Sequence, residues 1–231
     1  MLIRESSARP ALVELDDLAR NDLPPWLGKH EESLREIVEW ASSYLARPHP
    51  EVGRKGHVCP FVKTSMNRGL FYLAVEPGIP KNSAEAAEVL RVYRDWFVEL
   101  ARQYGGAAQY TTILVLFPDL PSDRVAEIIE NTQVLLKADY VSHGLMIGEF
   151  HDGPPAKGGL WNPEFRPLKS PVPLLAIRHM VPTDLPFLQD DPEQLAEYRR
   201  RYGQEAPTAT AARPPGSGPD AGPSAAEFLE P

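Results

Sequence analysis

The hydrophobic residues recur at helical spacing in several segments, which predicts amphipathic helices there. The first is residues 31–46, and a second lies between Ser83 as N-cap and Gly105 just past its end. A third follows Ser122, and a fourth begins at Asp191–Pro192 and ends at Gly203. In the third, the residues predicted to face inward are Val125, Ile128, Ile129, Leu135 and Leu136.

Apolar and β-branched runs between these helices predict strands. The expected strands are residues 57–63, 70–76, 111–117, 144–151 and 173–181. The alternation of helices and strands predicts an α+β fold: a single mixed β-sheet flanked by helices, as in a ferredoxin-like sandwich. A Rossmann fold is less well supported, because no Gly-rich phosphate loop follows a strand.

The chain divides into three parts by composition. Residues 1–28 are mixed in character and interrupted by prolines, so we expect an irregular lead-in. Residues 29–203 form the predicted single α+β domain. Residues 204–231 lack apolar periodicity and are rich in Ala, Pro and Gly, which predicts a disordered tail. Residues 151–172 form a long Pro-rich loop, read either as an ordered lid over one face or as a loop closing the core.

The composition and net charge of the chain limit the classes of molecule that it is expected to bind. The net charge of −8 disfavours nucleic acid, because binding phosphates requires clustered Lys and Arg. No apolar run approaches the roughly 20 residues of a membrane helix, and the N-terminus lacks a secretory signal. A single cysteine excludes an internal disulfide, so we expect a cytoplasmic protein without a membrane anchor. We expect a small-molecule substrate, and a homodimer stays open.

Cys59 is the only cysteine, and Pro60 follows it directly. A lone cysteine is more often an inert buried residue than a reactive one. If residues 57–63 form a strand, His57 and Cys59 share a face and can form one site. Cys59 and His57 are therefore the catalytic candidates, and Arg54 and Lys55 would favour a thiolate. A structural zinc site is not expected, because zinc needs four ligands and no second cysteine exists.

Other polar residues at strand ends and in the long loop are candidate cofactor ligands or contacts. His143 joins Cys59 and His57 as a candidate metal ligand because it lies at a strand end, and His179 lies inside the last strand. Arg178 alternates with His179, so the two face opposite sides of the sheet. A buried arginine needs an anion, either Glu149 on the neighbouring strand or a bound carboxylate. Arg166 and Lys169 are further candidates for such a carboxylate.

Three stretches, "HVCPFV", "GLMIGEFH" and "NPEFRPLKSPVPLLAIRHMVPTDLPFL", resemble a bacterial family of unassigned activity found near natural-product pathways. More distantly, the Cys-Pro-Phe segment before a predicted strand resembles the YqcI/YcgG-like proteins, which include heme-dependent N-oxygenases acting on amino acids. Their motif is Pro-Cys rather than Cys-Pro. The resemblance extends only to Cys59, Pro60 and Phe61, and it implies heme as a cofactor, with Cys59 or a nearby histidine as axial ligand.

Three hypotheses follow from these observations. The first is a heme-binding oxygenase that modifies a small amino-acid-derived metabolite in a biosynthetic pathway. The second is a metal-free enzyme that uses Cys59 as a nucleophile with His57 or His143 as base. The third is a non-enzymatic binding or accessory module whose Pro-rich loop and tail contact a partner.

Overall fold

The computed structural model of this protein describes residues 12–21, 23–53, 55–156 and 162–203. Its centre is one five-stranded sheet with the strand order β1-β2-β3-β5-β4. β2 and β3 run parallel and every other neighbouring pair is antiparallel, so the sheet is mixed. The predicted α+β class with a single mixed sheet flanked by helices is confirmed. The strands are β1 (Val13–Glu14), β2 (Phe71–Val75), β3 (Thr112–Leu116), β4 (Leu145–Phe150) and β5 (Leu174–His179).

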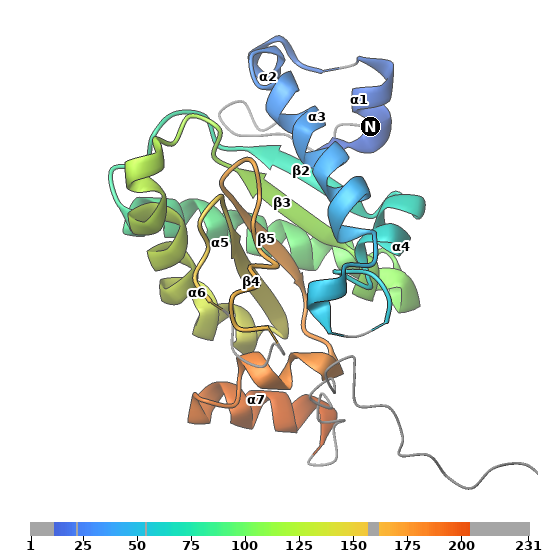
Figure 1. The fold of residues 1–231 in the computed structure, drawn as a ribbon, viewed down its shortest axis with the longest axis vertical. Helices are drawn as coiled ribbons and strands as arrows, with labels where there is room; N and C mark the ends of the chain where they lie inside the picture. The colour runs from blue at the N-terminus through green and yellow to red at the C-terminus, as the bar shows by residue number, and fades with distance from the viewer. Residues whose placement is uncertain (1–11, 22, 54, 157–161, 204–231) are drawn as a thin grey trace, which may run out of the picture.

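Helices cover both faces of this sheet (Figure 1). We name the faces after their main helices, the α5/α6 face and the α3/α4 face. The helix α7 packs beyond one end of the sheet and contacts α6. The α-helices are α1 (Leu15–Arg20), α2 (Pro25–Gly28), α3 (Glu31–Trp40), α4 (Val62–Asn67), α5 (Ser83–Arg102), α6 (Asn131–Ser142) and α7 (Pro192–Tyr202). The 3₁₀- and π-helical segments are η1 (Ala41–Leu45), η2 (Pro50–Val52), η3 (Gly105–Tyr110), η4 (Ser122–Arg124), η5 (Ala126–Glu130) and η6 (Pro182–Phe187).

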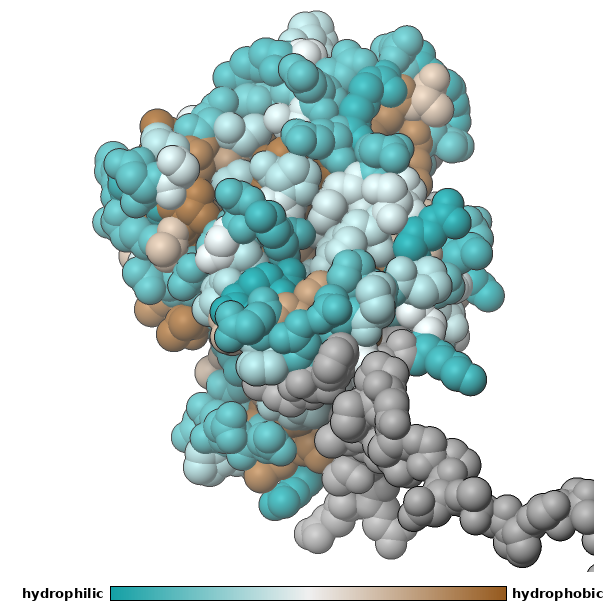
Figure 2. Space-filling view, viewed as in Figure 1, coloured by the Kyte–Doolittle hydropathy of each residue, from teal (hydrophilic) through white to brown (hydrophobic). Residues whose placement is uncertain are grey.

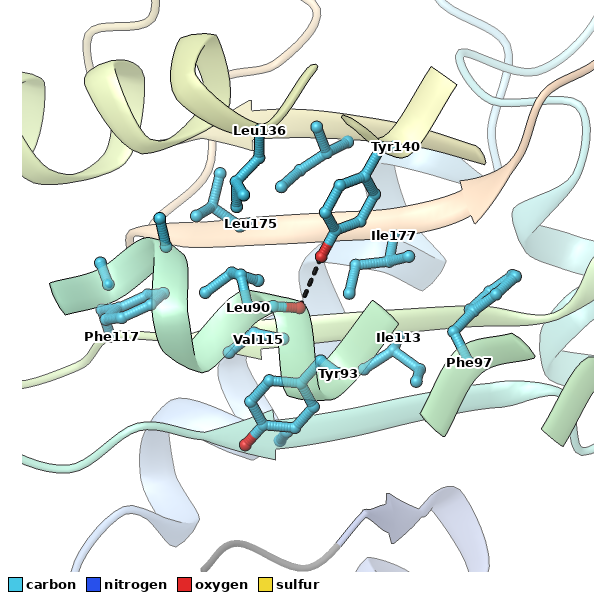
Figure 3. Packing of buried hydrophobic residues seen from close by; sticks show 14 of the residues in the cluster. Leu90, Tyr93, Phe97, Ile113, Val115, Phe117, Leu136, Tyr140, Leu175 and Ile177 are labelled. Carbon is cyan, nitrogen blue, oxygen red and sulfur yellow. Dashed lines mark hydrogen bonds between the residues drawn. The ribbon is translucent and has the colours of Figure 1, made fainter. Parts of the chain in front are cut away.

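The strand alternation assigns each side chain to one face. On β3, Ile113 and Val115 point into the core under α5 and α6, whereas Leu114 and Leu116 point to the α3/α4 face. Figure 3 shows the first of these two cores, where the Tyr140 hydroxyl donates a 2.6 Å hydrogen bond to the carbonyl of Leu90. The β-branched run therefore forms a central strand buried on both faces, as predicted.

Two predictions about the first 63 residues were wrong. Residues 12–21 and 23–28 are not an irregular lead-in, because β1 pairs with β2, and Leu18 and Leu27 are buried in the α3/α4 core. Residues 57–63 do not form a strand. Apart from an isolated bridge between His57 and Pro48, this segment turns into α4.

The remaining elements differ from expectation only in detail. α5 is capped by Asn82, whose side chain accepts a hydrogen bond from the Glu85 amide, rather than by Ser83. α7 begins after Asp191 and ends at Gly203, as predicted. The proposed tail, residues 204–231, lies outside the described residues.

The surface is mostly hydrophilic. On the face shown in Figure 2, apolar residues form small separate areas among polar ones. Within the described ranges, no helix combines the length and the apolar character needed to cross a membrane. The large apolar side chains that are exposed are Trp26, Ile79, Val134, Leu135 and Phe187.

Candidate functional site

Arg178 lies near the end of β5 and forms the best-defined ion pair of the α3/α4 face. Its Nη1 donates a hydrogen bond to Oδ2 of Asp184 and its Nη2 donates one to Oδ1, each at 2.7 Å. Asp184 belongs to η6 and is only 3% exposed, whereas the Arg178 side chain is 32% exposed. The Asp184 carboxylate also accepts from the amide of Val181. Asp184 therefore fixes the orientation of the guanidinium, while part of the Arg178 side chain stays exposed to solvent.

Cys59 lies in the turn that precedes α4. Its backbone N–H donates a 2.9 Å hydrogen bond to the carbonyl of Leu45, and that of Val58 donates to Arg47. Leu45 is the last residue of η1, where helical carbonyls lack intrahelical donors, and Arg47 follows two residues later. The turn is therefore held by carbonyls at and just after the end of the α3–η1 helix. The Cys59 thiol is free and partly buried.

Cys59 and Arg178 meet on the same face of the sheet. Cys59 and Ala176 both pack against the α3/α4 core, and Arg178, two residues further along β5, shares the face of Ala176. Burial alone would lower the pKa of Arg178. The Asp184 carboxylate outweighs this effect and, with smaller contributions from the Cys59 thiolate and Tyr202, raises the pKa above its usual value.

Aromatic contacts connect the Cys59 turn to η3. The ring of Phe61 lies 6.2 Å from that of Tyr110, and the Arg68 guanidinium lies 5.2 Å above the same Tyr110 ring. Ser65 is buried in α4, and its hydroxyl has no hydrogen-bond partner in the described part of the chain. α4 therefore packs between β2 and η3, and these contacts hold the turn that carries the Cys59 thiol.

Two of the three predicted histidines, His143 and His179, lie away from Cys59. His57 is two residues from Cys59, but residues 57–63 do not form a strand, so the strand-based argument for a shared face does not hold. His143 ends α6, is exposed, and its Nδ1 lies 2.8 Å from the carbonyl of Asp139. His179 faces α5, with its ring 5.0 Å from that of Phe97. The predicted alternation of Arg178 and His179 is therefore confirmed.

The described part of the long loop packs on the α3–η1 helix. The Trp40 indole donates to the carbonyl of Lys169, and the Tyr44 hydroxyl donates to that of Pro167. Phe165 stacks on His49 with ring centroids 4.8 Å apart. These contacts fit both readings of the loop, an ordered lid over one face and a loop that closes the core. Trp161 belongs to the same loop but lies outside the described residues.

The two basic residues predicted from this loop have local partners. Arg166 donates to the carbonyls of Pro163 and Phe165, at 2.7 and 3.4 Å. The Lys169 ammonium lies 3.0 Å from the Asp152 carboxylate, and both side chains are exposed. Neither forms a hydrogen bond or an ion pair with Arg178 or Cys59 among the described residues. Arg54, expected to favour a thiolate, also lies outside them.

Metal ligation by a protein cluster is not apparent. Over the residues that the structure describes, no group of three or more His, Cys, Asp or Glu side chains is arranged to hold a metal ion. The predicted set of Cys59, His57 and His143 is therefore not brought together as one metal site. Ligation of heme iron needs only one protein side chain, so this observation does not test the heme prediction.

Sequence reasoning missed two buried acid–base partners. Glu149 on β4 was one of the two predicted partners of Arg178, but it lies opposite Leu175 of β5, and Arg178 forms its ion pair with Asp184. The available signal was the Asp three residues after Val181, which is a helix-capping position. His151 Nε2 also lies 3.1 Å from the Glu130 carboxylate, joining η5 to the end of β4.

The fold and this site define an α+β protein with a free cysteine beside a fixed arginine. The chain belongs to the family defined by a domain of unknown function, DUF6875, whose model matches residues 34–213. No curated protein and no solved structure matches the chain. The matched range includes α4, β5 and η6, and so contains every residue of the Cys59–Arg178 site.

Proposed function

We propose that this protein is a heme-binding enzyme of the oxygenase type that modifies a small amino-acid-derived metabolite. The observation that supports the proposal is the placement of Cys59 and Arg178 on the same face of the sheet. Cysteine thiolate is one of the side chains that hold heme iron, and it favours O–O bond cleavage there. Arg178 adds a fixed cation to the same face of the sheet.

The residues present fit such a cofactor in part. Cys59 is free, partly accessible and followed by Pro60, which has no N–H and stiffens the chain behind the sulfur. His57 is the alternative ligand because it belongs to the same turn. His143 does not fit as a ligand in this site, because it ends α6 on the other side of the sheet. Cys59 would thus hold the iron, and Arg178 would place a positive charge on the same face of the sheet.

The test is the absorption spectrum of the full-length protein with hemin. A Soret band typical of thiolate ligation is expected, and Cys59→Ser should abolish it. His57→Gln distinguishes the alternative ligand, and Lys63→Gln is the matched control because Lys63 is an exposed cation on α4. The proposal fails if hemin gives no Soret band, or if the band is unchanged in both Cys59→Ser and His57→Gln.

A second candidate is a metal-free enzyme in which Cys59 is the nucleophile. This candidate rests on the same placement of Cys59 and Arg178, because nucleophilic cysteines occur in electropositive, partly exposed surroundings. In protein without hemin, iodoacetamide should then alkylate Cys59 faster at neutral pH than it alkylates the peptide GHVCPFV. Equal or slower alkylation, together with a Soret band lost in Cys59→Ser, would leave only the heme enzyme.

A further inference from the structure

The hydrogen bonds of Arg178 leave part of its guanidinium unused. Of the five N–H donors of an arginine, three have partners among the described residues. Nη1 donates to Asp184 and to the carbonyl of His179, and Nη2 donates once to Asp184. The two others, Nε–H and the second N–H of Nη2, lie side by side along one edge of the planar group. We call them the open edge.

We propose that the open edge of Arg178 binds the carboxylate of a small acid beside Cys59. Two parallel N–H groups match the two oxygens of a carboxylate, which is the geometry of bidentate arginine recognition. The Arg178 side chain as a whole is 32% exposed, so part of it can be reached by a ligand from solvent. Asp184 holds the guanidinium in place before a ligand arrives, which lowers the entropic cost of binding.

Asp184 restricts the ligands that the open edge of Arg178 can bind. Both of its oxygens accept hydrogen bonds from Arg178, one of them also accepts from Val181, and the residue is almost fully buried. Asp184 therefore cannot turn to bind the ammonium group of an amino acid. Because Asp184 already balances the charge of Arg178, the open edge recognises a ligand through its two parallel N–H donors. We infer a carboxylate, supplied either by the substrate or by a heme propionate.

This inference names the ligand class of the site described under Proposed function, and the two fail separately. Carboxylate binding can occur without heme, and heme can bind through Cys59 without using the open edge. The first experiment therefore uses no heme. It compares alkylation of Cys59 by iodoacetate, which carries a carboxylate, with alkylation by the neutral iodoacetamide. In each case the sulfur forms a C–S bond and iodide leaves.

Relative to the peptide GHVCPFV, the protein should prefer iodoacetate, and its rate should saturate with iodoacetate concentration. Arg178→Lys keeps the charge but removes the open edge, so the preference should fall about tenfold, as expected for one lost bidentate contact. Lys63→Gln should keep the preference. An equal preference in wild type and Arg178→Lys overturns the proposal. So does a thiol that neither reagent reaches, since the edge would then be closed to acids.

A measurement on the wild-type protein covers the case in which Arg178→Lys misfolds. Sodium acetate should slow alkylation by iodoacetate, whereas sodium chloride at equal ionic strength should not; equal slowing by both salts contradicts the inference.

A comparison of the binding of hemin with that of hemin dimethyl ester, which lacks free propionates, identifies the source of the carboxylate. If a propionate uses the open edge, Arg178→Lys should weaken hemin about tenfold and leave the ester unaffected. If the substrate uses it, both porphyrins should bind Arg178→Lys as they bind wild type, while the iodoacetate preference is still lost.

Discussion

The two faces of the central sheet differ in how they treat polar groups. On the α5/α6 face, the buried hydroxyls of Tyr72, Tyr93 and Tyr140 all take part in hydrogen bonds with protein groups. The α3/α4 face is equally apolar at its centre, but at one end it carries the free thiol of Cys59 and the open edge of Arg178. The buried tyrosine hydroxyls of the α5/α6 face are therefore satisfied within the protein, whereas the α3/α4 face keeps a thiol and a guanidinium partly exposed to solvent.

This difference separates stability from chemistry along the same strands. β5 contributes Leu175 and Ile177 to the α5/α6 face, here called the closed face, and Arg178 to the α3/α4 face, here called the open face. Substitutions on the α5/α6 face should therefore alter the free energy of unfolding and leave the reactivity of the Cys59 thiol unchanged. Changes at the lid or at the strand end should alter accessibility or pH response with a small effect on stability.

The largest effect is expected from Phe97→Ala on the closed face. Phe97 is fully buried between α5 and the sheet, so its removal leaves a cavity and should lower the unfolding free energy by about 3–5 kcal/mol. Urea denaturation measures this change. Leu135→Ala on α6 is the control, because Leu135 is 55% exposed, and its effect should stay within about 0.5 kcal/mol.

The same two proteins test whether the faces are independent. In the folded state, Phe97→Ala should leave the rate of Cys59 alkylation unchanged. A large change in that rate at temperatures well below unfolding would show that the two faces are coupled, and would contradict the comparison.

Leu135 also shows where sequence reasoning fails. Its neighbours Ile128, Ile129 and Leu136 are buried as predicted, but the π-helical turn of η5 shifts the helical phase and leaves Leu135 outside. Apolar runs predicted β3 and β5, helical spacing predicted α5, and the capping residues Asp191 and Gly203 predicted α7. Such patterns contain no information about one extra residue in a helical turn.

The site was predicted residue by residue, but not in its arrangement. Cys59 and Arg178 were both candidates, although nothing local in the sequence places them together, because they come from elements far apart in the chain. The alternation of "HVCPFV" was taken for a strand, but two of its amides satisfy carbonyls at and just after the end of η1. That choice depends on tertiary contact, which overrides the local pattern. The Asp184 partner depends on the position of η6 for the same reason.

A smaller effect is expected at the lid. Trp40→Phe removes the hydrogen bond from the indole to the carbonyl of Lys169, which should cost about 0.5–1.5 kcal/mol. Hydrogen exchange of amides in residues 162–172 should become faster, because the loop loses an anchor to α3. Trp26→Phe is the matched control, since Trp26 lies on α2 and is 40% exposed.

The same exchange measurement addresses the third hypothesis, a binding module whose loop becomes ordered on a partner. The contacts of Trp40, Tyr44 and Phe165 lead us to expect protection of residues 162–172 in the isolated protein. Unprotected amides in the wild type, with no change in Trp40→Phe, would instead support ordering by a partner.

The smallest expected effect is a pH dependence at His179, which follows Arg178 but faces the closed side. Burial, aided by the nearby Arg201 charge, lowers the pKa of His179 below its usual value of 6.5, although a backbone hydrogen bond with Gly144 opposes the shift. The unfolded chain then binds a proton before the folded protein does. The associated stability is complete above the unfolded pKa and is lost as the pH falls toward the folded pKa.

Urea unfolding at about pH 7.5 and about pH 5.5 should therefore show a decrease in stability for wild type that is smaller in His179→Gln. Arg201→Gln should also reduce the decrease, because it removes the repulsion that disfavours the imidazolium. If His179→Gln keeps the full wild-type decrease, the pH response originates elsewhere, and the closed face would not contribute to it through this residue. If the decrease shrinks while the iodoacetate preference of Cys59 is unchanged, two adjacent residues of β5 serve the two faces independently.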